Sequence, residues 1–160
     1  MQAYEFINNL IPPLKLKDKV KLALNWMEEI RTDILPVVEE SRFLGFITED
    51  LVFTINNPET SIAEISLDNV SCFVYQDKHI YDVIKVASEF HSNMIAVVDR
   101  ENNYLGVVTM EDAISAFADS LSIQSNGAVL VLSMNMTDYS LFEIARIIES
   151  ENTKILSSFL

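Results

Sequence analysis

The strongest constraint on this chain is an internal repeat: residues 15–38 align with residues 75–98 without a gap, at an offset of 60. In each copy a segment with helical periodicity is followed by a continuous apolar strand, a polar turn and a second strand that carries a glycine, Gly45 or Gly106. The apolar helical face is formed by Val20, Ala23, Leu24, Met27 and Ile30 in the first copy, and by Ile80, Val83, Ile84, Ala87 and Phe90 in the second. Units of this size cannot bury both faces of their helices alone. We therefore expect them to pack face to face around a shared core, with pseudo-twofold symmetry.

Polar side chains stand where the helices of both copies are expected to begin. Asp18 and Asp77 come just before the helical runs, where a carboxylate can accept hydrogen bonds from free backbone amides. Thr48 and Thr109 end the second strands, and an acidic helix start follows each of them. These positions predict four capped helices.

The spacing between the threonine and the next aspartate differs between the copies. Asp112 lies three residues after Thr109, whereas Asp50 lies two residues after Thr48 and Leu51 takes the third position. One residue along a helix rotates the side chain by about 100°. We therefore expect Asp50 to point away from the direction that Asp112 takes.

The charge of the chain restricts its partners. It carries 24 acidic and 11 basic residues, a formal net charge of −13. A nucleic-acid-binding protein needs a basic footprint, and an anionic membrane surface attracts basic segments, so both partners are disfavoured. A small anionic ligand stays possible, since a few amides and cations can hold a phosphate locally. No apolar run reaches the roughly 18 residues of a membrane span, and the N-terminus does not resemble a signal peptide.

The residues that usually carry catalysis or bind metals are sparse. Cys72 is the single cysteine, and His79 and His91 lie 12 positions apart in one predicted helix, too far to share a metal ion. The sequence has no Gly-rich phosphate loop and no HExxH, GxSxG or CxxC motif. We therefore expect no catalytic site, no metal site and a reducing, cytoplasmic setting.

Two short motifs carry a family resemblance. The segment 106–112 resembles the G-h-h-T/S-x-x-D ending of a CBS repeat, where h is apolar, and the segment 35–38 resembles the h-P-V-V strand of the same repeat. Two copies at this spacing look like a tandem CBS domain pair, or Bateman module, covering about residues 5–121. The resemblance implies an α/β (α+β) fold of two pseudo-symmetric βαββα repeats packed face to face. We expect the first repeat, with an N-terminal helix, at residues 1–65 and the second at 66–123.

The resemblance also implies a function, regulatory sensing of a small molecule in the cleft between the repeats. In CBS pairs that bind adenosine ligands, the threonine or serine and the aspartate three residues later hold the phosphate or ribose. The implied ligand is AMP, ADP, ATP or S-adenosylmethionine, and no cofactor is required. The implied contacts are Thr109, Asp112, Thr48, Asp50, Pro36, Ile95 and Lys15.

A structural module is the alternative, with a degenerate cleft and a role in oligomerisation. The spacing after Thr48, Ala96 in place of a second strand proline and the net charge favour it. A homodimer is expected in either case, through apolar residues of the helices after the two threonines. These residues are Leu51, Val52, Phe53, Ala113, Ile114 and Phe117.

The C-terminal segment, residues 124–160, follows a different pattern. Its order predicts a strand over 128–134, a helix over 138–150 and a strand over 153–159. The segments 127–132 and 139–145 resemble the first half of a ferredoxin-like ACT domain, which runs βαββαβ. A lone βαβ unit leaves sheet edges unpaired, so we expect either a truncated chain or pairing with another subunit.

Overall fold

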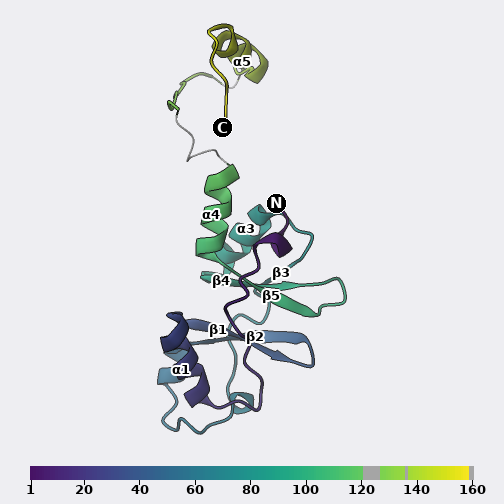
Figure 1. The fold of residues 1–160 in the computed structure, drawn as a ribbon, viewed down its shortest axis with the longest axis vertical. Helices are drawn as coiled ribbons and strands as arrows, with labels where there is room; N and C mark the ends of the chain where they lie inside the picture. Colours follow the sequence, from purple (N-terminus) through teal and green to yellow (C-terminus); the bar gives the residue numbers. More distant parts are fainter. Residues whose placement is uncertain (121–126, 136, 159–160) are drawn as a thin grey trace. The chain divides into compact units, whose positions relative to one another are not determined.

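A computed structural model describes residues 1–120, 127–135 and 137–158 of the chain (Figure 1). The chain divides into two compact units, residues 1–116 and residues 117–160, which are described separately. In the described part of the chain no helix is long and apolar enough to cross a membrane.

The first repeat is a helix followed by a β-hairpin and a short second helix. The elements are α1 (Val20–Ile30), β1 (Ile34–Glu39), β2 (Arg42–Thr48) and α2 (Glu49–Phe53). β1 and β2 pair antiparallel, with one irregularity between Val37 and Val38, toward the turn of the hairpin. Leu14, on the segment before α1, forms a parallel bridge with β1. This bridge lies where the second repeat has a third strand.

The second repeat repeats this order with the same hairpin register. The elements are β3 (Phe73–Tyr75), α3 (Ile80–Phe90), β4 (Met94–Val98), β5 (Tyr104–Thr109) and α4 (Met110–Ser120). β3 lies parallel to β4, and β4 pairs antiparallel with β5 with an irregularity at the equivalent position. The duplication predicted from the sequence is therefore confirmed in both repeats.

The segment that precedes each repeat crosses to the sheet of the other repeat. The N-terminal segment, with the 3-10 helix Ala3–Phe6, bonds to the second repeat: the Asn8 amide donates to the Val107 carbonyl at 2.8 Å. The segment after the 3-10 helix Ile62–Glu64 bonds to the first repeat, where the Asp68 amide donates to the Phe46 carbonyl at 2.9 Å. Figure 1 shows the N-terminal segment beside β5 before it continues toward α1. The two repeats are therefore joined through their backbones as well as through the core.

Gly45 and Gly106 make these crossings possible. A Cβ atom on Gly45 would lie 2.8 Å from the Asp68 carbonyl oxygen, and a Cβ on Gly106 would collide with Cγ2 of Ile7. Gly45 also has a φ of +146°, a conformation that side chains disfavour. Both glycines are therefore required by the close approach of a crossing segment to the second strand of a hairpin.

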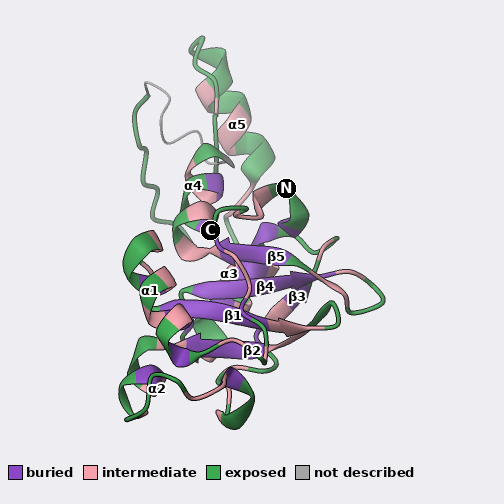
Figure 2. Ribbon diagram, turned by 60° about the horizontal axis from the view of Figure 1, so that its bottom comes forward, coloured by how far each residue is buried: buried purple, intermediate pink, exposed green. Residues whose placement is uncertain are grey.

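The core of the first unit is continuous across both repeats. Figure 2 shows buried residues concentrated in the strands of the two sheets. All five residues of β4 are buried, which explains why this strand reads as an unbroken apolar run. The two hairpins meet directly: the Tyr104 amide donates to the Ser41 carbonyl at 2.7 Å, and the ring of Tyr104 stacks on Phe43. The shared core expected from the helical faces is therefore present.

Two sequence expectations for this unit are wrong in detail. Asp18 and Asp77 are not the residues that cap α1 and α3. The N-cap positions are Lys19 and His79, and the Nδ1 atom of His79 accepts a hydrogen bond from the Tyr81 amide at 3.3 Å. The carboxylate of Asp18 instead accepts a hydrogen bond from the Lys15 backbone amide at 2.8 Å.

Two of the six expected interface residues, Val52 and Ala113, lie inside the core because they face the sheets.

In the second unit, the helix α5 (Leu141–Ser150) is confirmed, and Ser140 caps it by accepting a hydrogen bond from the Glu143 amide at 3.3 Å. The two expected strands beside it are not formed: residues 127–135 and 153–158 form no strand, and residue 159 lies outside the described residues. A strand exists only when another backbone segment supplies the partner for its N–H and C=O groups. Val129 is 93% exposed, so this apolar segment is unburied in the described chain.

Candidate functional site

The strand-to-helix junction of the second repeat is built by a reciprocal set of hydrogen bonds. The Asp112 amide donates to Thr109 Oγ1 at 3.1 Å, and the Thr109 amide donates to Asp112 Oδ2 at 3.2 Å. This is a capping box at the start of α4, so the capping interpretation of Thr109 is confirmed. The Thr109 hydroxyl also donates to Asp112 Oδ2 at 2.5 Å, which fixes the carboxylate at the end of β5.

The N-terminal crossing segment completes this junction. The Asn8 side-chain amide donates to Asp112 Oδ2 at 3.2 Å, across 104 residues of sequence. Three donors therefore share Oδ2, which leaves Oδ1 as the oxygen that a ligand hydroxyl would approach. Asn8 was not predicted as a site residue, because its partner lies in the other repeat.

The corresponding junction of the first repeat has a different acidic residue. Thr48 caps α2 by accepting a hydrogen bond from the Leu51 amide at 3.3 Å. Its hydroxyl donates to Asp68 Oδ2 at 3.2 Å. Asp50 is exposed on α2. Asp68, on the second crossing segment, was missed by the sequence reasoning, although it lies 60 residues after Asn8, the offset of the repeat itself.

A cavity of about 520 Å³ opens at this first junction, a volume typical of small-molecule sites. Its walls come from both repeats and from the second crossing segment. The lining residues are Asp33, Ile34, Thr48, Glu49, Asp50, Leu51, Thr54, Asp68, Asn69, His91, Ser92 and Asn93. The cavity therefore lies between the repeats, where the family resemblance implies a cleft.

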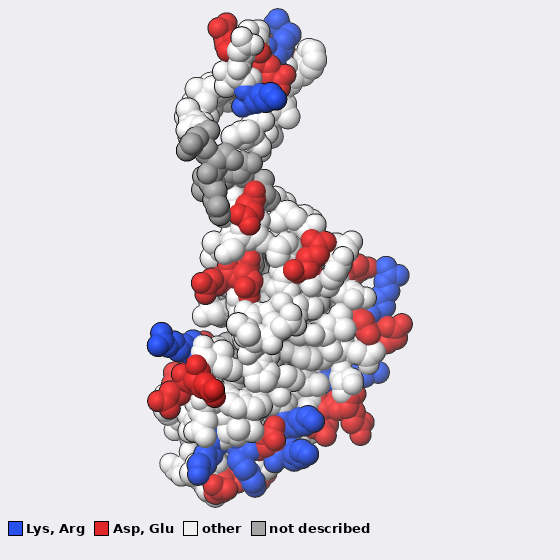
Figure 3. Space-filling model, in the orientation of Figure 1, with Lys and Arg blue, Asp and Glu red and all other residues white. Residues whose placement is uncertain are grey.

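The lining of this cavity is acidic. It contains four carboxylates, on Asp33, Glu49, Asp50 and Asp68, and no lysine or arginine. Basic side chains gather elsewhere: the exposed Lys15, Lys17, Lys19 and Lys21 surround the start of α1, and Figure 3 shows the positive group at the lower end of the view. The cavity thus favours neutral or cationic groups over anionic ones.

Five of the seven implied ligand contacts do not line this cavity: Thr109, Asp112, Pro36, Ile95 and Lys15. Pro36 and Ile95 are buried inside β1 and β4, where the Pro36 carbonyl accepts a hydrogen bond from the Leu14 amide at 2.8 Å. Lys15 is exposed and its amide donates to Asp18 Oδ2 at 2.8 Å. Of the seven implied residues, the structure places Thr48 and Asp50 in the cavity wall.

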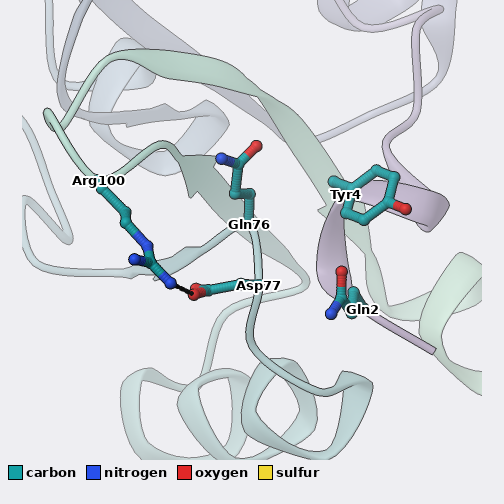
Figure 4. Close-up of a pocket in the computed structure, with 5 residues that line it drawn as sticks. All are labelled: Gln2, Tyr4, Gln76, Asp77 and Arg100. Atoms are coloured by element: carbon teal, nitrogen blue, oxygen red, sulfur yellow. Dashed lines mark hydrogen bonds and ion pairs between the residues drawn. The ribbon is translucent and has the colours of Figure 1, made fainter.

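A second hollow, of about 380 Å³, lies at the opposite end of the second repeat. It is lined by Gln2, Tyr4, Gln76, Asp77 and Arg100, and Figure 4 shows the ion pair between Arg100 and Asp77, 2.8 Å long, on one side of it. This ion pair holds the pKa of the Asp77 carboxyl below its usual range. The hollow is at the turn end of the β4–β5 hairpin, whereas Thr109 is at the other end, so it is separate from both threonine junctions.

Two buried ionisable groups lie outside these sites. Burial raises the pKa of the Cys72 thiol to about 11. Burial also raises the pKa of the Tyr104 phenol. Among the described residues no cluster of His, Cys, Asp and Glu could hold a metal ion.

Comparison with known proteins identifies the class of this fold. Residues 62–119 match the model of the CBS domain. The structure is similar to that of a CBS domain pair/ACT domain protein from Thermotoga maritima, with a TM-score of 0.68 and 20% identity over 76% of this chain and 99% of that one. It is also similar to CBSX2 in complex with AMP, with a TM-score of 0.63 and 16% identity over 78% of this chain and 98% of that one. Residues 62–119 are therefore a CBS domain, and the chain has the fold of a CBS domain pair.

A curated relative shares part of the sequence. The carnitine transport ATP-binding protein OpuCA of Listeria monocytogenes is 31% identical over 117 residues, which are 72% of this chain. The matched region is 29% of that relative's length, so the chain spans less than a third of it.

Proposed function

We propose that this chain is a regulatory module, not an enzyme, that binds an adenine nucleotide or another adenosyl ligand in the cleft between its two repeats. The observation that carries the proposal is a hydroxyl–carboxylate pair at the end of the second strand of each repeat, Thr109 with Asp112 and Thr48 with Asp68. One of these pairs borders a cavity of suitable size between the repeats. The similarity to CBSX2, which binds AMP, supports an adenosyl ligand.

The chemistry of these pairs suits a ribose. An ionised carboxylate accepts hydrogen bonds from both ribose hydroxyls, and a threonine hydroxyl both donates and accepts. A ligand in the cavity would touch Asp33 and Thr48 of the first repeat and Asn93 of the second. Binding would therefore favour one arrangement of the repeats, which is the basis of a regulatory signal.

Calorimetric titration of the full chain with AMP, ADP, ATP and S-adenosylmethionine tests this proposal. We expect saturable binding of at least one ligand, weakened in Asp112→Asn and retained in Thr109→Ser, which keeps the hydroxyl that caps α4. Circular dichroism shows whether the variants stay folded. No binding of any of the four ligands to the folded native protein would refute the proposal.

A structural module is the second candidate function. The acidic lining of the cavity favours it, because four carboxylates without a lysine or arginine oppose the phosphate of a nucleotide. Under this candidate the same titrations show no heat, while the oligomeric state is unchanged by any ligand.

We also propose a homodimer in the reducing cytoplasm, formed through α2 and α4. Phe53 is 69% exposed and Ile114 is 61% exposed, at positions 61 residues apart that the repeat makes equivalent. Exposed apolar residues at equivalent positions of two pseudo-symmetric helices suit an isologous interface. Sedimentation of Phe53→Asp should show a monomer, whereas Leu10→Asp, at another exposed apolar position, should not change the mass. A monomeric native protein at high concentration would contradict this.

A further inference from the structure

The carboxylate that bonds to the strand-end threonine lies on the helix in the second repeat and on the crossing segment in the first. Asn8 and Asp68 are equivalent at the offset of 60, and Leu51 and Asp112 are equivalent at the offset of 61. In the second repeat the crossing segment supplies the amide and the helix supplies the carboxylate. In the first repeat the crossing segment supplies the carboxylate and the helix presents a leucine. Each strand-end threonine is thus bonded to one carboxylate, although the two come from different parts of the chain.

The carboxylate of Asp68 is placed to meet a ligand. It is exposed and lines the cavity of about 520 Å³, together with Thr48. Its bond from the Thr48 hydroxyl, at 3.2 Å, is longer than the 2.5 Å bond between Thr109 and Asp112. Its backbone is fixed independently of the side chain, because its amide and carbonyl both bond to Phe46, at 2.9 and 2.8 Å. The carboxylate is therefore held in position and has acceptor capacity left for hydroxyl groups.

The charges around Asp68 select against a phosphate. Asp33, Glu49 and Asp50 line the same cavity, and its lining contains no lysine or arginine. The four carboxylates are all exposed, so together they repel an anionic group at the cavity, and added salt screens this repulsion. A ligand that carries ribose hydroxyls without a phosphate, neutral or cationic, avoids this repulsion.

We infer that Asp68 is the hydroxyl-binding carboxylate of the first cleft, and that this cleft takes adenosyl ligands that lack a phosphate. The inference rests on the proposed function and assigns the ligand class of that same cleft. It also makes the first cleft a complete site, although no aspartate occupies the third helical position after Thr48.

The ligand class is tested with adenosine and AMP, which differ by one phosphate, and with S-adenosylmethionine as a cationic adenosyl ligand. Calorimetry of the full chain should show adenosine and S-adenosylmethionine binding roughly tenfold or more tightly than AMP. Added sodium chloride should weaken binding of S-adenosylmethionine and leave adenosine unchanged, because salt screens charge. Tighter binding of AMP than of adenosine would overturn the inference.

The role of Asp68 is tested by Asp68→Asn, which keeps the shape and removes the charge. Adenosine affinity should fall by roughly tenfold or more, the effect expected when a hydrogen bond to a charged acceptor is lost. Glu28→Gln is the matched control, because it removes one charge from an exposed position of α1 away from the cavity lining. Its adenosine affinity should equal that of the native protein.

A double variant moves the carboxylate from the crossing segment to the helix. Asp68→Asn with Leu51→Asp recreates in the first repeat the amide and carboxylate that Asn8 and Asp112 form in the second. Leu51 is half-buried at the start of α2, where an acidic residue is tolerated. We expect the double variant to recover the adenosine affinity lost in Asp68→Asn.

The outcomes separate the two proposals. If none of adenosine, AMP, ATP and S-adenosylmethionine binds to the native protein, the proposed function itself fails. If a ligand binds, and Asp112→Asn weakens it while Asp68→Asn does not, the proposed function stands and the role of Asp68 is refuted.

Discussion

Gly45→Ala should destabilise the first unit strongly, because two separate costs meet at this position. The φ of +146° lies in a region that residues with a Cβ rarely adopt, at a cost of about 1–3 kcal/mol. The added Cβ would also lie 2.8 Å from the Asp68 carbonyl oxygen and 3.0 Å from Cβ of Leu67. That carbonyl cannot retreat freely, since it accepts the Phe46 amide at 2.8 Å. Crowding of this kind costs about 1–3 kcal/mol more.

The sum is a loss of about 2–6 kcal/mol in the free energy of unfolding, or roughly 5–20 °C in melting temperature for a chain of this size. Thermal and urea unfolding followed by circular dichroism measure it. Gly127→Ala is the control: its Cβ would meet Leu156 Cδ1 at 3.8 Å, an ordinary contact, so we expect a change within about 0.5 kcal/mol. If Gly45→Ala were as mild as Gly127→Ala, the close packing of the crossing segment on β2 would be refuted.

Two further predictions concern the buried groups of the core. Cys72, with its pKa raised to about 11, should react with a thiol reagent at pH 8 only after unfolding in urea. The pKa of this thiol is lower in the unfolded chain than in the folded one, so the stability that the thiol contributes below pH 9 should be lost as the pH rises through about 11. This loss should be smaller in Cys72→Ala. A thiol in the native protein that reacts as fast as the thiol of a free peptide would contradict both expectations. Tyr104→Phe should leave the free energy of unfolding unchanged or raise it by up to about 1 kcal/mol, because the phenol oxygen is buried without a hydrogen-bond partner in the described chain, and a clear loss of stability in urea would show that the hydroxyl is satisfied.

The elements of the first unit were predictable from the sequence because periodic burial controls them. α1 and α3 bury Ala23 and Val83 at equivalent positions, and β4 is buried along its whole length, so the apolar pattern records the packing directly. The caps were less predictable. Several polar residues precede each helix, and α1 begins after Lys19 although Asp18 is the better capping residue in isolation.

The strands expected beside α5 show a different limit. The segment 127–135 has the composition of a strand, but composition supplies only a preference and the hydrogen-bonding partner must come from elsewhere. In the described residues that partner is lacking, so the same apolar sequence lies exposed. A pattern that correctly predicts a strand inside a closed repeat fails where pairing is incomplete.

The candidate site shows why a local motif describes only half of a site of this kind. The spacing of Thr109 and Asp112 lies within one helical turn, so the sequence reveals their pairing, and the structure contains it. Asp68 reaches Thr48 across 20 residues because the chain crosses from one repeat to the other, and no motif confined to one strand and helix includes it. Asp68 can be found in the sequence when the alignment of the two repeats is continued toward the N-terminus. At the same offset of 60, Asp68 then aligns with Asn8. In a duplicated fold whose connecting segments each bond to the sheet of the other repeat, the residues of one site come from both repeats. When one helix lacks the aspartate, the crossing segment should therefore be searched for the carboxylate before the site is called degenerate.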